Sequence, residues 1–171
     1  MREKEYGIWQ TLTWAQLADQ SLAMAAGLHH AGLKSSEHVV VVGSNRPRLY
    51  AAMLAVQSLG AIPIPLYQDA VAAECVFPIN NAEVRFAMVE DQEQVDKMLE
   101  IREQCPQLAH IYYDDPRGLR NYEHAGLGSI EQLLETGQSL AKSQQFVKQQ
   151  IEAAKPDDVA AMFFTSGTTG N

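Results

Sequence analysis

The chain has 171 residues, of which 46% are hydrophobic and 20% are charged, a composition ordinary for a soluble globular domain with a sizeable core. Its formal net charge of −8 argues against nucleic acid or an anionic membrane as the main partner, although it leaves room for a local positive patch around a phosphate site. No apolar run approaches the roughly 18 residues of a membrane helix, and the start of the chain lacks the apolar core of a signal peptide. The only two cysteines, Cys75 and Cys105, form no CxxC pair, so we expect free, buried thiols in a reducing cytoplasm.

The N-terminal stretch predicts a short strand followed by a helix. Residues 6–11 carry the strand pattern. Thr13 and Gln16 have the spacing of a capping box, and apolar residues then recur at helical spacing as far as Leu28. Gly32 is expected to cap the C-terminus of this helix, and Trp14 is expected to anchor it in the core.

A run of four valines at 39–42 predicts a buried strand that ends in a turn. Asn45 is expected to cap the helix that follows. Arg46 and Arg48 stand at the start of that helix, where cations oppose the helix dipole. They could serve an anionic partner or pair with an acid, but we favour an ordinary solvated surface.

The middle of the chain alternates strands and helices. Residues 61–66 are apolar but include two prolines, each without a ladder donor, which predicts a short or edge strand. Asp69 is expected to cap the next helix, and Pro78 to end or kink it. Asp114 and Asp115 lie in a turn cluster, and we interpret them as turn residues rather than metal ligands. Further strands are expected at 85–89 and 108–112, and further helices at 91–106, 128–137 and 140–155.

The end of the chain holds its most informative pattern. Residues 159–164 are six apolar residues in a row and predict a strand buried on both faces. A run of small hydroxyl residues and glycines follows at once, Thr165-Ser-Gly-Thr-Thr-Gly170. Glycines allow a ligand to approach the backbone closely, and successive N–H groups in such a turn can cradle an anion. We interpret this loop as the binding site for nucleotide phosphates, although a solvated tail has the same composition.

Strands near 39, 61, 85, 109 and 159, each flanked by helices, predict the α/β class with a mostly parallel sheet and helices on both faces. Ligand sites in such sheets lie beyond the carboxyl ends of the strands, which is where the loop at Thr165 is expected. The loop is not a Walker A motif, because no Gly-Lys-Ser/Thr follows it within the sequence.

The segment from Phe163 to Asn171, Phe-Phe-Thr-Ser-Gly-Thr-Thr-Gly-Asn, resembles the phosphate-loop signature of the adenylate-forming (AMP-binding) superfamily. Other stretches are similar to bacterial long-chain acyl-CoA synthetase-like proteins of that superfamily, and they follow in matching order: 7–10, 13–17, 43–47, 59–63, 65–67, 91–97 and 113–119. Two places depart from the family pattern. Ser36-Glu37 stands where Gly-Asp is usual, and 76–78, with Pro78, interrupts a segment that is usually plain helix.

The resemblance implies an ATP-dependent acid–thiol ligase of fatty acid metabolism. Such an enzyme joins a carboxylic acid, here a long-chain fatty acid, to AMP and then transfers the acyl group to coenzyme A, with Mg²⁺ as the metal. The phosphate-binding residues that it implies are Thr165, Ser166, Gly167, Thr168, Thr169 and Gly170. It implies no catalytic residue and no metal ligand within the chain, because the family's catalytic lysine, adenine pocket and ribose-binding aspartate come later in the sequence.

We therefore expect residues 1–171 to be part of the N-terminal domain of a longer ligase, with a leading strand and helix at 1–35 and an α/β subdomain at 36–171. Alone, this fragment is expected to be inactive in adenylation. Contact of the parent protein with a membrane, its oligomeric state and its acyl-chain specificity stay open. Three alternatives are an adenylating enzyme for another class of acid, a non-catalytic α/β binding domain, and a nicotinamide-binding Rossmann domain, the last disfavoured because no GxGxxG follows the strand at 39–42.

Overall fold

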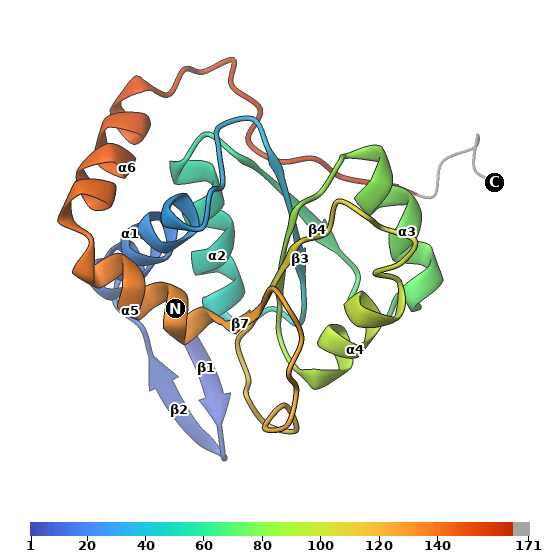
Figure 1. The fold of residues 1–171 in the computed structure, drawn as a ribbon. Coiled ribbons are helices and arrows are strands. Elements are labelled where there is room, and N and C mark those ends of the chain that lie inside the picture. The colour runs from blue at the N-terminus through green and yellow to red at the C-terminus, as the bar shows by residue number, and fades with distance from the viewer. Residues whose placement is uncertain (166–171) are drawn as a thin grey trace.

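The computed structural model describes residues 1–165, apart from the side chain of Glu5, and contains a two-stranded hairpin and a five-stranded parallel sheet (Figure 1). The strand order in the sheet is β4-β3-β5-β6-β7. The elements are β1 (Arg2–Glu5), β2 (Ile8–Thr11), α1 (Trp14–His30), β3 (His38–Val42), α2 (Pro47–Ser58), β4 (Ile62–Leu66), α3 (Ala72–Asn81), β5 (Phe86–Val89), α4 (Gln92–Glu100), β6 (His110–Tyr113), β7 (Leu127–Ser129), α5 (Ile130–Ser139) and α6 (Ala141–Ala153).

Helices cover both faces of the parallel sheet, which confirms the predicted fold class. In Figure 1, α1, α2, α5 and α6 lie on one side of the strands, and α3 and α4 lie on the other. Each face has its own apolar core, because alternate residues of a strand point to opposite sides. Val39 and Val41 belong to the core under α1, α2 and α5, whereas Val40 and Val42 belong to the core under α3 and α4. The central strand β3 is therefore buried on both sides, as its four valines predict.

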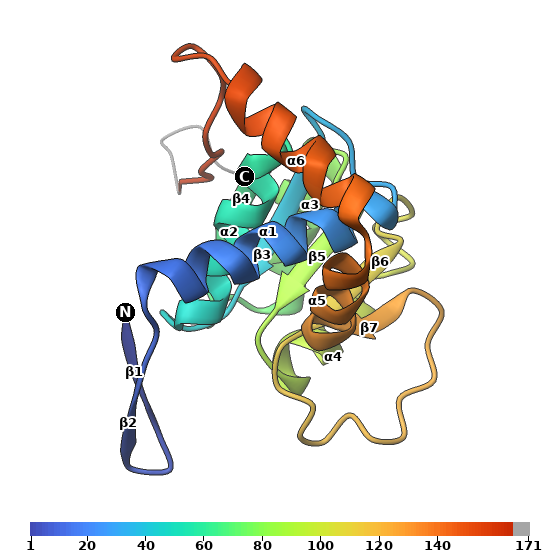
Figure 2. The same ribbon diagram turned by 90° about the vertical axis from the view of Figure 1, so that its left-hand side faces the viewer.

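Helix α1 begins with the predicted capping box. The Thr13 backbone N–H donates to Oε1 of Gln16, and the Gln16 N–H donates to Oγ1 of Thr13. The prediction that Trp14 lies in the core is wrong, since its side chain is 80% exposed. The buried stripe of α1 starts one turn later, at Leu17, because the beginning of the helix extends beyond α5 and α6 (Figure 2).

The hairpin β1–β2 projects from the body of the molecule, and both Figure 1 and Figure 2 show it clear of the parallel sheet. Its two-residue turn is Tyr6-Gly7, with φ of 47° and 81°. Positive φ at both positions is the requirement of a type I′ turn, whose twist matches that of the paired strands. Glycine adopts this backbone freely, but an aromatic residue does so at a cost. Strand β1 lies outside the strand predicted at 6–11.

Strand β4 lies at an edge of the sheet, as its two prolines predict. In β4, the residues that alternate with the prolines direct their backbone N–H and C=O groups toward β3. The Ile62 N–H, for example, donates to the carbonyl oxygen of Glu37. Pro63 and Pro65 therefore direct their carbonyl groups to the outer side, where neither residue has an N–H. The outer edge of β4 thus offers acceptors but no donors at these two positions.

Residues 159–164 do not form the buried strand that was predicted. They lie beside β4, where the Met162 N–H donates to the carbonyl oxygen of Pro63 (3.1 Å), and Val159 and Phe163 remain 60% and 69% exposed. The reason is that the proline-containing edge of β4 supplies too few hydrogen bonds for a regular ladder. The fifth strand of the parallel sheet is instead β7, next to β6 at the opposite end of the sheet.

Two of the predicted helix caps are also wrong. The N-cap of α2 is Arg46 rather than Asn45, and the N-cap of α3 is Val71 rather than Asp69. Helix α3 continues through Pro78 to Asn81, so the proline does not end it. A proline removes one backbone donor, and the turns on either side of Pro78 are enough to continue the helix.

Candidate functional site

The carboxyl ends of the parallel strands carry a cluster of polar side chains. Ser44 follows β3, Glu90 follows β5, and Asp114 follows β6. Because the strands are parallel and paired in register, these residues meet at one edge of the sheet. This is the edge at which α/β proteins bind ligands.

Glu90 organises the centre of this edge. Its carboxylate accepts hydrogen bonds from the Ser44 backbone N–H (2.5 Å) and the Ser44 hydroxyl (2.7 Å), and it pairs with Nε of Arg46 (2.9 Å). The absence of a side chain at Gly43 allows this close approach, since a Cβ atom at Gly43 would lie 2.7 Å from the Cβ of Glu90. The bonds of Glu90 therefore hold the turn after β3 against the end of β5.

Arg48 forms a second group of ion pairs. Its Nε lies 3.2 Å from Oδ1 of Asp114, and its Nη2 lies 3.6 Å from Oε2 of Glu131. Burial raises the pKa of Asp114, and the opposing effect of Arg48 only partly offsets this. Asp115 pairs instead with Arg117, whose hydrogen bonds lower the pKa of the Asp115 carboxyl.

These contacts decide between the interpretations of the two arginines of α2. Arg46 and Arg48 are not merely solvated, because each pairs with a carboxylate from another element. They therefore link the start of α2 to the carboxyl edge of the sheet. The two adjacent aspartates also pair with arginines. Among the described residues, no group of three His, Cys, Asp or Glu side chains could hold a metal ion.

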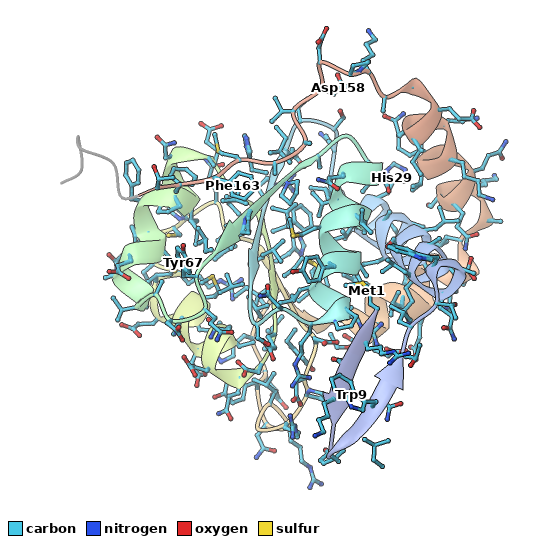
Figure 3. The ribbon with its side chains drawn as sticks, turned by 180° about the vertical axis from the view of Figure 1, so that it is seen from behind. Met1, Trp9, His29, Tyr67, Asp158 and Phe163 are labelled. Carbon is cyan, nitrogen blue, oxygen red and sulfur yellow. The ribbon has the colours of Figure 1, made fainter. Side chains whose placement is uncertain are left out.

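A pocket of about 410 Å³ lies between the ends of β3 and β4. Its lining combines apolar side chains with polar residues of the loops that follow β3 and β4. Its lining includes Leu49, Tyr50, Met53, Leu66, Tyr67 and Asn45. Tyr67 is 85% exposed at the mouth of this pocket, and Figure 3 shows the residue beside α3. The sequence interpretation did not identify this pocket, because its lining comes from separate stretches of the chain that the parallel pairing of β3 with β4 brings together.

The predicted phosphate-binding residues fall almost entirely outside the described part of the chain. Thr165 is described and exposed, whereas Ser166, Gly167, Thr168, Thr169 and Gly170 lie outside the described residues. The segment that precedes them runs in the same direction as β4. Nε2 of Gln57, near the end of α2, donates to the Ala160 carbonyl (2.7 Å), and Phe164 packs edge-on against Phe77 in the middle of α3 (6.0 Å).

Two cysteines lie away from this edge. Cys75 and Cys105 are free and buried, and burial raises the pKa of both thiols. Within residues 1–165, no helix combines the length and apolar character needed to cross a membrane.

The fold is that of the adenylate-forming enzymes. The anthranilate CoA ligase AuaEII, solved in complex with anthranoyl-AMP, matches 94% of the chain with a TM-score of 0.72 and 18% identity. Acetoacetyl-CoA synthetase from Streptomyces lividans matches 95% of the chain with a TM-score of 0.71 and 20% identity. The chain covers 28% and 25% of these two structures, respectively.

The chain belongs to the AMP-binding enzyme family, whose model matches residues 2–171. Among curated relatives, it is 26% identical to the long-chain-fatty-acid–CoA ligase ACSBG2 of Xenopus laevis over 99% of the chain. It is 24% identical to the long-chain-fatty-acid–CoA ligase FadD15 of Mycobacterium tuberculosis over 96% of the chain. The chain spans 22% and 26% of the length of these two relatives, respectively.

Proposed function

We propose that this chain supplies the N-terminal part of an ATP-dependent acid–CoA ligase whose substrate is a long-chain fatty acid. The observation that carries the proposal is the family match over residues 2–171, which includes the hydroxyl- and glycine-rich loop at its end. The names of the curated relatives favour a long-chain acid. In this proposal, ATP and the acid give an acyl-adenylate and pyrophosphate, and the thiol of coenzyme A then takes the acyl group.

Residues Thr165 to Gly170 are the proposed phosphate-binding residues. The backbone N–H groups and hydroxyls of such a loop would hold phosphate oxygens while the carboxylate approaches the α-phosphorus. The direction of residues 160–164 along β4 supports this role, because it takes the chain from the amino edge of the sheet toward its carboxyl edge. When bound, Mg²⁺ would supply charge stabilisation for the phosphates.

The described residues of the carboxyl edge have a different role in this proposal. Glu90 and Arg48 tie the turn after β3 and the start of α2 to neighbouring elements, so the edge is rigid before any ligand binds. A rigid support is what a phosphate-binding loop requires, because misplacement of a reacting group by about 1 Å can lower a rate by about 100-fold.

The test is ATP–pyrophosphate exchange in a protein of the relatives' length that contains this chain. We expect exchange with palmitate, and we expect a Gly167→Ala, Thr169→Ala double substitution to lower it by about 100-fold or more. A Thr11→Ala substitution, on the exposed hairpin, is the matched control and should leave exchange unchanged. Equal exchange by the loop variant and the control would contradict the role of the loop.

A panel of acids separates this ligase from the alternatives. Exchange with benzoate or acetate but not with palmitate would reject the long-chain substrate and keep the adenylating class. No exchange with any acid, together with no protection of the loop from proteolysis by ATP, would favour a non-catalytic binding domain. The 171-residue chain itself should give no exchange.

A further inference from the structure

Residues 159–165 lead along the outer edge of β4 to the proposed phosphate-binding residues, but few backbone bonds hold them there. In Figure 3, this segment runs from Asp158 past Phe163 toward α3. Among the described residues, a single backbone hydrogen bond joins the segment to β4, from the Met162 N–H to the Pro63 carbonyl oxygen (3.1 Å). The two prolines of β4 have no N–H with which to add another. The position of the segment therefore depends on side chains.

The side chains of the segment alternate between the core and solvent, as in an extended chain. Met162 and Phe164 pack against the core under α3 and α4, whereas Phe163 is 69% exposed. Phe164 meets the ring of Phe77, in the middle of α3, with the ring centres 6.0 Å apart and the ring planes at 88°. This is an edge-to-face arrangement, which aromatic rings favour. Phe77 therefore contacts the residue that directly precedes Thr165.

The other attachments of the segment lie farther from Thr165. Nε2 of Gln57 donates to the Ala160 carbonyl oxygen (2.7 Å), five residues before Thr165, and this bond is exposed to water. The bond from the Met162 N–H lies three residues before Thr165. In the described part of the chain, the contact of Phe77 is thus the attachment nearest to the first proposed phosphate-binding residue.

Phe77 has no comparable role in either core. Its side chain is 67% exposed, so burial of the ring contributes little to stability. Residues 76–78 are also the stretch that departs from the family pattern, so the family match does not imply this contact. The contact with Phe164, rather than burial, accounts for an aromatic ring at this position of α3.

We propose that Phe77 is a positioning residue for the phosphate-binding loop. Its ring holds Phe164 and thereby sets the place at which Thr165 leaves the edge of β4. Phe77 does not itself bind ATP in this role. The role rests on the proposed function, because it matters only where residues Thr165 to Gly170 hold phosphates. A loop with a displaced base would bind ATP more weakly, since its donors must converge on the same phosphate oxygens.

The first test measures ATP–pyrophosphate exchange in a protein of the relatives' length that contains this chain. Phe77→Ala should raise the KM for ATP by about tenfold, close to the largest contribution of one aromatic pair to an equilibrium. The KM for palmitate should stay unchanged. A general defect in folding would instead lower the amount of active enzyme and leave both KM values as they are. Phe77→Tyr, which keeps the ring, should restore the KM for ATP.

Two further variants test whether the effect arises at the contact. Ile151→Ala removes a side chain of similar exposure (51%) from α6, on the opposite face of the sheet, and should leave both KM values unchanged. Phe164→Ala should raise the KM for ATP as Phe77→Ala does. In the Phe164→Ala background, Phe77→Ala should then add less than about twofold, because the contact is already lost.

The second test needs neither ATP nor ligase activity. Hydrogen exchange of the same protein, followed by mass spectrometry, reports the opening of the Met162 amide in peptides that cover residues 159–165. Phe77→Ala should speed this exchange by about 2- to 12-fold, the range that one aromatic pair contributes. Phe77→Tyr and Ile151→Ala should leave it unchanged.

The results distinguish this role from the ligase proposal. If the parent protein gave no ATP–pyrophosphate exchange with any acid, the ligase proposal would be wrong and this role with it. If the parent were active and Phe77→Ala changed the KM for ATP by less than about twofold, only the role of Phe77 would be rejected. Equal rises of both KM values, or unchanged hydrogen exchange in Phe77→Ala, would also reject that role and leave the ligase proposal in place.

Discussion

Removing the carboxylate of Glu90 should destabilise the protein more than any exposed ion pair could. In a Glu90→Ala variant, the backbone N–H and hydroxyl of Ser44 lose an acceptor that lies 2.5 Å and 2.7 Å away. The side chain of Glu90 is only 13% exposed, so water replaces it poorly. The turn after β3 would then lose its attachment to the end of β5.

The magnitude follows from these contacts. A hydrogen bond to a charged group contributes about 1.5–3 kcal/mol, and a buried N–H left without a partner costs about 1–3 kcal/mol. The Arg46 side chain is 39% exposed, so its ion pair adds less than about 1 kcal/mol. Because these contributions overlap, we expect Glu90→Ala to lower the free energy of unfolding by about 3 kcal/mol. Glu90→Gln, which keeps one carbonyl oxygen, should lower it by about 1–2 kcal/mol.

Urea unfolding followed by far-UV circular dichroism measures both changes. Glu131→Gln is the matched control, because Glu131 is 65% exposed and its contact with Arg48 is long, at 3.6 Å. Its effect should stay within about 0.5 kcal/mol. If Glu90→Ala lowered the stability by less than about 1 kcal/mol, with an unchanged m-value, the reasoning about this edge would be wrong.

Three further predictions concern the scaffold. Ser36 has a φ of 66°, so Ser36→Gly should raise the free energy of unfolding by about 0.5–1 kcal/mol, and destabilisation in a urea titration would contradict this. A Cβ at Gly137 would lie 1.8 Å from the Ala23 carbonyl oxygen. Gly137→Ala should therefore lower the free energy of unfolding by about 2–4 kcal/mol, although alanine has the better helix propensity. A stabilised variant in thermal unfolding would show that α1 and α5 do not cross so closely. His110 stacks on Phe86, and burial lowers the pKa of its imidazole. The neutral imidazole therefore contributes to the free energy of unfolding above the unfolded-state pKa, and this contribution is lost as the pH falls through the folded-state pKa. Stability measured from pH 7.5 to 5 should therefore fall less steeply in His110→Phe, and an identical slope would reject this role.

The sequence correctly predicted those helices and strands that are determined by their own residues. The capping box of Thr13 and Gln16 and the valines of β3 act through neighbouring residues or through uniform burial, so the sequence alone was sufficient. The prolines of β4 likewise indicated an edge position before any partner strand was known.

The errors arose where the outcome depends on distant parts of the chain. Residues 159–164 are as apolar as a buried strand, but they meet an edge of β4 with few donors and remain partly exposed. Trp14 has the correct helical spacing, yet it lies one turn beyond the buried part of α1. For the carboxyl edge, the residue types were visible, but the pairing of Glu90 with Arg46 joins positions that only the parallel register brings together.

The prolines of β4 have a consequence for how copies of this protein meet. Two such edges placed side by side would bring carbonyl oxygens opposite carbonyl oxygens at Pro63 and Pro65, without an amide hydrogen between them. Their dipoles would repel, and no continuous sheet could grow from one molecule into the next. The two prolines that limit the attachment of residues 159–164 to β4 thus also protect this edge of the sheet against polymerisation.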